Sequence, residues 1–294
     1  MAAARPSIAT ESDTILLPPI PNIPTSTMKF SDISKPSSDL LGNDYCSNVT
    51  LKAKGLSAGP VSVSIETERS AAGTLSSKIG GKFAYAGLNF DKLEANADGS
   101  NVLETSLVPC PGCKMTFKAK KGADLGLEYT AGKMTTTGSL DVLNMSKFST
   151  SACIGVSPAI NLGGDLSYNL SGDKAGLSSY NVGASYATGP MFASVTTANK
   201  FAQFNVGVLY KVNKDLSLAS STTHSSAKAC NVAAIGGSYS GLGSVGTIKA
   251  KVGSNGVTSA CLVKEIAPKV NLTASGSISG TDTSTFKYGL GITM

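Results

Sequence analysis

Apolar and polar residues alternate along most of the chain after residue 47. In the stretch VSVSIE, residues 61–66, valine and isoleucine alternate with serine and glutamate. The same alternation recurs at residues 49–54, 114–120, 204–210, 248–252 and 270–274. Because successive side chains of a strand point to opposite faces, each stretch predicts a strand with one apolar and one polar face.

Turn-forming sequences separate these stretches. ADGS, CPGC, LGGD and SNG are examples, and such signals recur roughly every ten to fifteen residues. Links this short favour antiparallel hairpins, since parallel strands need longer crossover connections. No strong helical period interrupts residues 47–294, so this region is predicted to be one all-β unit.

The first 46 residues follow different patterns. Residues 1–28 are rich in proline, serine and threonine, and we expect them to be disordered. Residues 29–46 form a predicted helical segment with a short apolar stripe, which Pro36 should divide into two short turns. The residues of the stripe are Phe30, Ile33, Leu40 and Leu41.

Composition bears on whether the predicted strands lie in a membrane or in water. Only 15% of the residues are charged, against about 25% in a typical soluble domain. The apolar run ILLPPIPNIP is broken by prolines and is shorter than the roughly 18 residues that a spanning helix needs. No secretory signal precedes it. Uniform amphipathic strands of about ten residues suit a membrane barrel, while a soluble β-rich binding protein remains the alternative.

Several stretches resemble the mitochondrial porins, the family of voltage-dependent anion channels. They are KFSDISKPSSDLLGNDY near the start, LYKVNKDLSLAS, IKAKVGSNGVTSACLVKEIAPKVNLTASG and the final FKYGLGITM. The resemblance covers about residues 29–294. It implies a transmembrane β-barrel of about nineteen strands, residues 47–294, in which the last strand closes on the first in parallel. It also implies that the helical segment lies inside the pore.

The final strand also resembles a sorting signal for mitochondrial barrels, polar-x-Gly-x-x-hydrophobic-x-hydrophobic. Lys287, Gly289, Ile292 and Met294 fill its four positions. This resemblance implies recognition by the outer-membrane barrel assembly machinery. It also implies a location in the mitochondrial outer membrane, with the plastid outer envelope as an alternative.

Lysines lie on the polar face of the predicted strands. If the strands form a barrel, this face lines the lumen and attracts anions. In the porin family a glycine-leucine-lysine triad is linked to nucleotide binding. Here Gly112 and Lys114 keep two of its positions and Cys113 replaces the leucine, which implies attraction of ATP and ADP. The candidate residues are Lys52, Lys54, Lys114, Lys118, Lys120, Lys249, Lys251 and Lys287.

Two features depart from the family pattern. The leader of residues 1–28 is longer than usual. Some animal members also have a lipid-facing acid in strand four, and the nearest equivalent here is Lys92. Functions that depend on that acid are therefore not expected.

The sequence contains no recognisable catalytic motif, so an enzyme is not predicted. CPGC, residues 110–113, fits a turn better than a redox pair or half of a metal site, and the single histidine, His224, is expected in a loop. No cofactor, metal or nucleic-acid partner is predicted.

The predicted function is a voltage-dependent, weakly anion-selective channel for metabolites, nucleotides and small ions. Its expected partners are membrane lipid and anionic metabolites, with homo-oligomerisation as a further possibility. Besides the soluble protein, a protein-import channel of the same fold is an alternative, which would require acidic patches for basic presequences.

Overall fold

The computed structural model describes residues 28–171, 175–226, 230–280 and 285–294. The predicted disordered extension therefore lies outside the described residues, apart from Met28. The elements are η1 (Phe30–Asp32), α1 (Lys35–Gly42), β1 (Val49–Ala58), β2 (Val61–Arg69), β3 (Leu75–Tyr85), β4 (Leu88–Asn96), β5 (Asn101–Cys110), β6 (Cys113–Ala119), β7 (Ala123–Ala131), β8 (Met134–Asp141), β9 (Lys147–Gly155), β10 (Ile160–Asn169), β11 (Gly176–Thr188), β12 (Met191–Ala198), β13 (Gln203–Lys211), β14 (Leu216–Ser225), β15 (Cys230–Tyr239), η2 (Gly243–Val245), β16 (Thr247–Gly253), β17 (Val257–Ala267), β18 (Val270–Ser279) and β19 (Lys287–Thr293).

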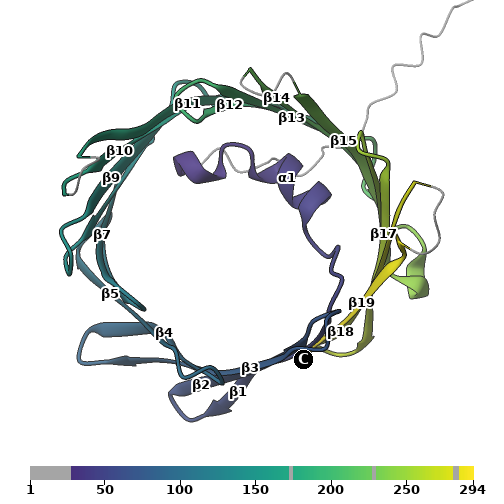
Figure 1. Ribbon diagram of the computed structural model, residues 1–294, viewed down its shortest axis with the longest axis horizontal. Coiled ribbons are helices and arrows are strands. Elements are labelled where there is room, and N and C mark those ends of the chain that lie inside the picture. The colour runs from purple at the N-terminus through teal and green to yellow at the C-terminus, as the bar shows by residue number, and fades with distance from the viewer. Residues whose placement is uncertain (1–27, 172–174, 227–229, 281–284) are drawn as a thin grey trace, which may run out of the picture.

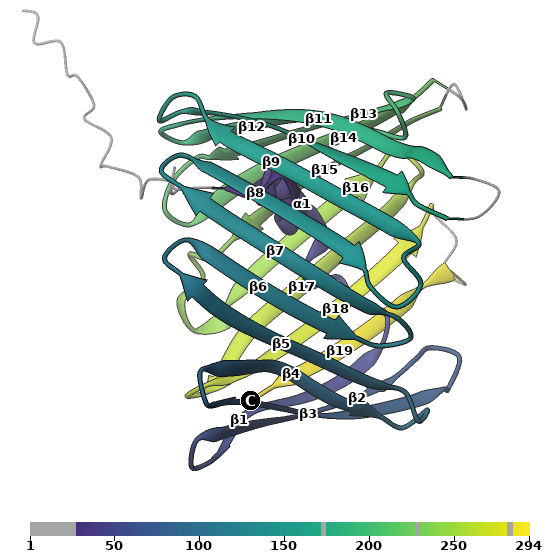
Figure 2. The ribbon, with the colours of Figure 1, turned by 90° about the vertical axis from the view of Figure 1, so that its left-hand side faces the viewer.

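The strands form one closed ring (Figure 1). Within the described part of the chain, nineteen strands belong to a single sheet, and each pairs with the next in sequence in antiparallel fashion. The strands are inclined to the axis of the ring, as closure of a barrel requires (Figure 2). The predicted all-β barrel is therefore confirmed.

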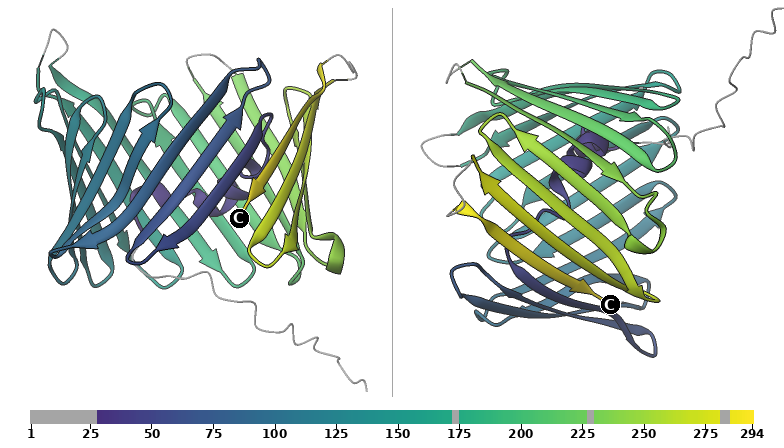
Figure 3. Two further views of the ribbon diagram at one scale, coloured as in Figure 1. Left: turned by 90° about the horizontal axis from the view of Figure 1, so that it is seen from below. Right: turned by 90° about the vertical axis from the view of Figure 1, so that its right-hand side faces the viewer.

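The barrel closes between its first and last strands. β1 and β19 pair in parallel, with Val49 opposite Leu290 and Lys52 opposite Thr293, and Figure 3 shows β19 beside β1. The Met294 N–H donates to the Lys52 carbonyl over 2.9 Å. Because the number of strands is odd and each consecutive pair is antiparallel, the first and last strands run in the same direction. Closure leaves no strand edge unpaired. Unpaired backbone N–H and C=O groups at such an edge would be costly in lipid.

Apolar side chains cover the outer face of the barrel. Leu51, Ile79 and Tyr288 are exposed there, and they alternate with polar residues that face the lumen. Few apolar side chains are buried within the described residues, and most of those belong to the N-terminal segment or contact it. A wall with an apolar outside and a polar inside suits lipid outside and water inside, which argues against a soluble protein.

One bulge interrupts the alternation, in β4. The register of β4 shifts by one residue against β3, where Gly81 is opposite Leu93 but Phe83 is opposite Phe90, and against β5 between Phe90 and Lys92. Because a bulge adds one unpaired residue, Asp91 lies between two ladder positions and its carboxylate reaches the lumen. Lys92 also faces the lumen, so it is not the lipid-facing counterpart suggested by the family resemblance.

The N-terminal segment lies inside the ring, against the wall formed by β9 to β15 (Figure 1). It consists of η1 and α1, but the break between them falls at Ile33 and Ser34, ahead of Pro36, whereas the sequence analysis placed it at Pro36. Pro36 lies in the first turn of α1, where its missing N–H breaks no helical hydrogen bond. No helix in the described residues is long and apolar enough to cross a membrane.

One local prediction was wrong. His224 was expected in a loop, but it belongs to β14, opposite Asn231 of β15. The run STTHSS lacks apolar residues, so its strand character comes from pairing with neighbours on both sides.

Candidate functional site: the pore and its N-terminal segment

Glycines in the barrel wall make room for the start of the N-terminal segment. A Cβ atom at Gly163 in β10 would lie 2.9 Å from Phe30 Cδ2 and 3.2 Å from Ile33 Cδ1. A Cβ atom at Gly183 in β11 would lie 3.2 Å from Phe30 Cε2. These distances are shorter than ordinary van der Waals contacts. A larger residue at either position would therefore displace η1 from the wall.

Glycines in the barrel wall also make room for α1. A Cβ atom at Gly207 in β13 would collide with the Ser37 hydroxyl, and one at Gly236 in β15 would lie 2.8 Å from Leu41 Cδ2. Ser37 has a relative exposure of only 1%. It was missed in the sequence analysis because it is polar. Its position four residues from both Ile33 and Leu41 places it on their helix face, which is the signal that could have identified it.

The predicted apolar stripe packs on this track of glycines. Ile33 is completely buried, and Leu40 and Leu41 are nearly so. Leu40 and Leu41 form a small core with inward-facing wall residues, among them Phe192 and Leu209. Full burial of such a side chain stabilises the segment by about 1.5–3 kcal/mol, and the contribution is smaller where part of the side chain stays exposed. The structure places Leu40 and Leu41 against apolar side chains of an otherwise polar lumen.

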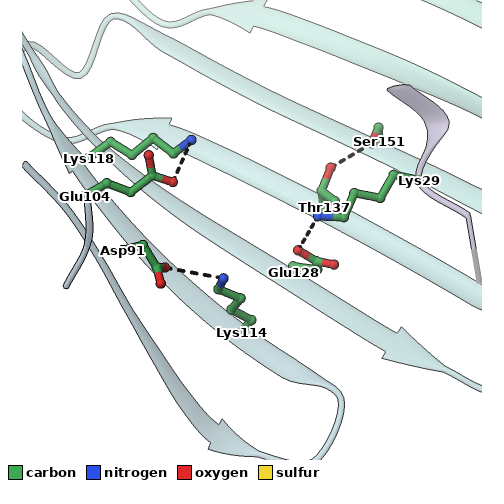
Figure 4. Close-up of polar contacts among 8 residues, drawn as sticks. All are labelled: Lys29, Asp91, Glu104, Lys114, Lys118, Glu128, Thr137 and Ser151. Carbon is green, nitrogen blue, oxygen red and sulfur yellow. Dashed lines mark hydrogen bonds and ion pairs between the residues drawn. The ribbon is translucent and has the colours of Figure 1, made fainter. Parts of the chain in front are cut away.

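An ion pair fixes the first residues of the segment. Lys29 Nζ lies 2.6 Å from Glu128 Oε2 of β7 (Figure 4). Because Glu128 belongs to β7, the pair attaches the segment to a part of the wall beyond the strands β9 to β15. Both side chains are only partly buried, so the pair contributes modestly, on the order of 1 kcal/mol or less.

Two predicted anion-attracting lysines hold the other end. Lys249 Nζ lies 2.6 Å from Asp44 Oδ2. Lys251 Nζ donates to the Leu41 carbonyl over 2.7 Å, and this carbonyl lies in the last turn of α1, where helical partners are missing. The Lys251 ammonium also lies 4.2 Å from the centre of the Tyr45 ring, a favourable cation–π arrangement. Both lysines therefore anchor the segment as well as contributing positive charge.

The linker from α1 to β1 runs along the inner side of the closure. The hydroxyl of Ser275 in β18 donates to the Cys46 carbonyl. A Cβ atom at Gly289 of β19 would collide with that carbonyl. Of the other predicted sorting residues, Lys287 is exposed on the lumen side, and Ile292 and Met294 belong to the outward-facing set. The four residues remain a predicted signal.

Tyr45 is the group in this linker whose pKa is clearly shifted. Burial, with smaller contributions from the nearby Cys261 and Asp44, raises its pKa to about 12. Its hydroxyl is buried without a hydrogen-bond partner among the described residues. A phenol in this position stays neutral at physiological pH.

The opposite wall, from β1 to β7, is lined by ion pairs. Lys114 Nζ lies 3.4 Å from Asp91 Oδ2, and Lys118 Nζ lies 3.1 Å from Glu104 Oε1, as Figure 4 shows. Further pairs join Lys52 and Lys78 to Glu66, and Lys92 to Glu94. Lys114 and Lys118 therefore face the lumen as predicted, but carboxylates offset much of their field.

Other lysines in this region lack such partners. Lys54 and Lys82 line a cavity of about 590 Å³ beside these pairs, and neither has a carboxylate within 4.0 Å among the described residues. Lys120 follows β6 and lies in the turn before β7. It therefore stands apart from Lys114 and Lys118, at the end of the strand.

Hydroxyl groups line the wall between the ion pairs and the N-terminal segment. Thr137 and Ser151 hydrogen-bond over 2.7 Å, as Figure 4 shows, and Ser149 and Ser167 over 2.9 Å. They belong to β8, β9 and β10 and lie beside a second cavity of about 630 Å³, which Ser149 and Ser151 line. No group of three or more potential metal ligands occurs among the described residues. This surface offers polar groups to a passing solute and no catalytic arrangement.

Comparisons with known proteins agree with this architecture. The family model for eukaryotic porin matches residues 26–291. The mitochondrial outer membrane protein porin of Candida albicans is 24% identical over 254 residues, covering 83% of this chain and 89% of the relative. The mitochondrial outer membrane protein porin of 36 kDa of Solanum tuberosum is 26% identical over 272 residues, covering 85% and 91%.

A solved mutant porin from Rh. blastica covers 82% of this chain and 94% of its own, at 12% identity. Its TM-score of 0.46 is too low to establish a common fold. The match of the family model over nearly the whole described barrel is the decisive finding. The chain therefore belongs to the eukaryotic porin family: it is a membrane porin channel, homologous to mitochondrial outer membrane porins, and not an enzyme.

Proposed function

We propose that this protein is a voltage-dependent, weakly anion-selective channel that passes metabolites, nucleotides and small ions across the mitochondrial outer membrane. The observation that carries this proposal is the N-terminal segment, which lies inside the lumen on a wall track of glycines and is held at both ends by lysine contacts. A charged segment inside a pore is a natural element for a response to voltage, because its charges lie in the transmembrane field.

The charges of the lumen support weak selectivity. Most lysines of the β1–β7 wall are paired with carboxylates, so their fields cancel at a distance. Lys54, Lys82 and Lys287 add positive charge without an ion-pair partner among the described residues. The resulting excess is small, and it favours anions such as ATP and ADP without excluding cations.

A protein-import channel of the same fold is less well supported. Such a channel would present carboxylates to a basic presequence. Here Glu66, Glu104 and Asp91 are all engaged by lysines, so they do not form an acidic surface.

The test is an ion gradient across a planar bilayer that contains the purified protein. A reversal potential that favours chloride modestly over potassium supports the proposal, as does a conductance that falls at high voltage of either sign. A clear preference for potassium would favour the import channel instead. The barrel assembly machinery, as the partner that reads the final strand, and homo-oligomerisation are further elements of the proposal.

A further inference from the structure

The turn between β5 and β6 brings two thiols face to face. Pro111 and Gly112 form this turn, and Gly112 has a φ of 80°. Proline followed by glycine with positive φ is the pattern of a type II turn. Cys110 and Cys113, which flank it, lie directly opposite each other in the register of the two strands.

The two cysteines are placed for a disulfide. Both are free, and they pair directly across the ladder of β5 and β6. Opposed residues of a strand pair have Cβ atoms about 4.5–5.5 Å apart, whereas a disulfide places them roughly 3.5–4.5 Å apart. A small inward movement of the two strand ends is therefore enough for bond formation.

The neighbouring strand holds the turn in this conformation. The Thr130 N–H of β7 donates to the Gly112 carbonyl over 2.7 Å, and a Cβ atom at 112 would collide with the Thr130 carbonyl. Because the turn is fixed on β7, the cysteines do not have to be brought together from an open loop. Much of the entropy cost of closing the ring is therefore met by the fold.

Exposure separates this pair from two other described cysteines. Cys110 is exposed and Cys113 half-buried, as is Cys46, whereas Cys153 and Cys261 have relative exposures of 2% and 4%. Oxidation of cysteine depends on access to the sulfur. The pair lies at the hairpin end of β5 and β6, next to Lys114.

We propose that Cys110 and Cys113 form a redox-active dithiol site that closes to a disulfide when a two-electron oxidant, such as a small hydroperoxide, reaches it. The Cys110 sulfur attacks one peroxide oxygen, the O–O bond breaks, and a sulfenic acid forms while an alcohol or water leaves. The Cys113 sulfur then attacks the sulfenic sulfur. The S–S bond forms, the S–O bond breaks, and the hydroxyl leaves as water with the Cys113 proton. The peroxide gains two electrons and the two thiols lose them.

The test uses the full chain, fully reduced and inserted in lipid nanodiscs, with hydrogen peroxide at low molar excess. Remaining thiols are alkylated after unfolding. The protein is then digested, and the mass of the peptide that contains residues 110–113 is measured by mass spectrometry. We expect this peptide to lose the mass of two hydrogens and to escape alkylation, with reversal by dithiothreitol. Cys153 and Cys261 of the same molecules should stay alkylatable.

The variant Cys113→Ser provides the matched control. It should abolish the loss of two hydrogens and leave Cys110 as a sulfenic acid that a dimedone probe captures. Unchanged single-channel conductance would show that the barrel is intact. The proposal is overturned if Cys110 and Cys113 both remain alkylatable after peroxide. It is equally overturned if Cys110 proceeds to a sulfinic acid while Cys113 stays a free thiol.

Discussion

Gly289 of the last strand lies directly against the main-chain carbonyl of Cys46, in the linker between the pore helix and the first strand. The same carbonyl accepts a hydrogen bond from Ser275 of β18. Where the barrel closes, the inner surface is thus shared between the wall and the linker. A glycine predicted for a sorting signal consequently has a packing role as well.

The variant Gly289→Ala should weaken this contact. Its methyl group would collide with the Cys46 carbonyl, and overpacking of this kind typically costs about 1–3 kcal/mol. We expect a lower apparent melting temperature for protein refolded in detergent, where the assembly machinery plays no part. Gly291→Ala is the control, because its nearest neighbours would lie 3.6 and 3.8 Å from the new methyl group. Equal melting temperatures for the two variants would contradict the packing role.

The variant Gly207→Val should release the pore helix. A side chain at this position would take the place of the Ser37 hydroxyl, while valine suits the strand itself. The N-terminal segment should become more sensitive to limited proteolysis, with the barrel still resistant. Gly138→Val is the matched control, since no atom lies within 4 Å of a Cβ at that position. Identical cleavage rates in the two variants would exclude this role for Gly207.

Deletion of residues 1–45 should leave a conducting barrel that responds less to voltage. The nineteen strands begin at Val49, so their pairing does not require the deleted residues. The charges of the segment, in contrast, are removed from the pore. The measurement is conductance as a function of voltage in planar bilayers. If the truncated channel closes with voltage as the full chain does, the segment is neither the gate nor its support.

Reversal of Lys114, Lys118 and Lys120 to glutamate should reduce anion preference. Each reversal changes the local charge by two units, and in the first two cases it also leaves Asp91 or Glu104 without its lysine. We expect the double variant at 114 and 118 to account for most of the shift in reversal potential. Lys120→Glu alone, in the turn beyond β6, should have little effect. An unaltered reversal potential in the triple variant would place these lysines outside the conduction path.

Tyr45→Phe should affect stability mainly at alkaline pH. Burial raises the Tyr45 pKa from 10.0 to about 12, so the unfolded chain loses this proton first and the folded state loses stability between these pH values. Phenylalanine removes that loss. It also removes a buried hydroxyl that lacks a partner among the described residues.

We therefore expect Tyr45→Phe to equal or exceed the unmodified chain in thermal stability at pH 7, and to exceed it at pH 11. Tyr288→Phe is the control, since that side chain is 67% exposed on the outer face. A loss of stability at pH 7 that is specific to Tyr45→Phe would show that its hydroxyl has a partner after all.

The sequence by itself determined the faces of the barrel wall. Alternation assigned Leu51 and Tyr288 to the apolar side and Lys52 and Lys114 to the polar side, because the direction of a strand side chain depends only on its parity. The helical stripe around Ile33 was visible for the same reason, since its period is local. Resemblance to a known family supplied the closure of the last strand on the first.

Only the tertiary structure decided which side chains meet. Asp91 reaches Lys114 because a bulge in β4 breaks the parity, and a bulge has no simple signature in one sequence. The glycines at 163, 183, 207 and 236 are far apart in sequence. They form one track under the N-terminal segment because the barrel brings successive strands side by side. Parity is a property of one strand, whereas partners depend on register and curvature, and these are set by the whole closed sheet.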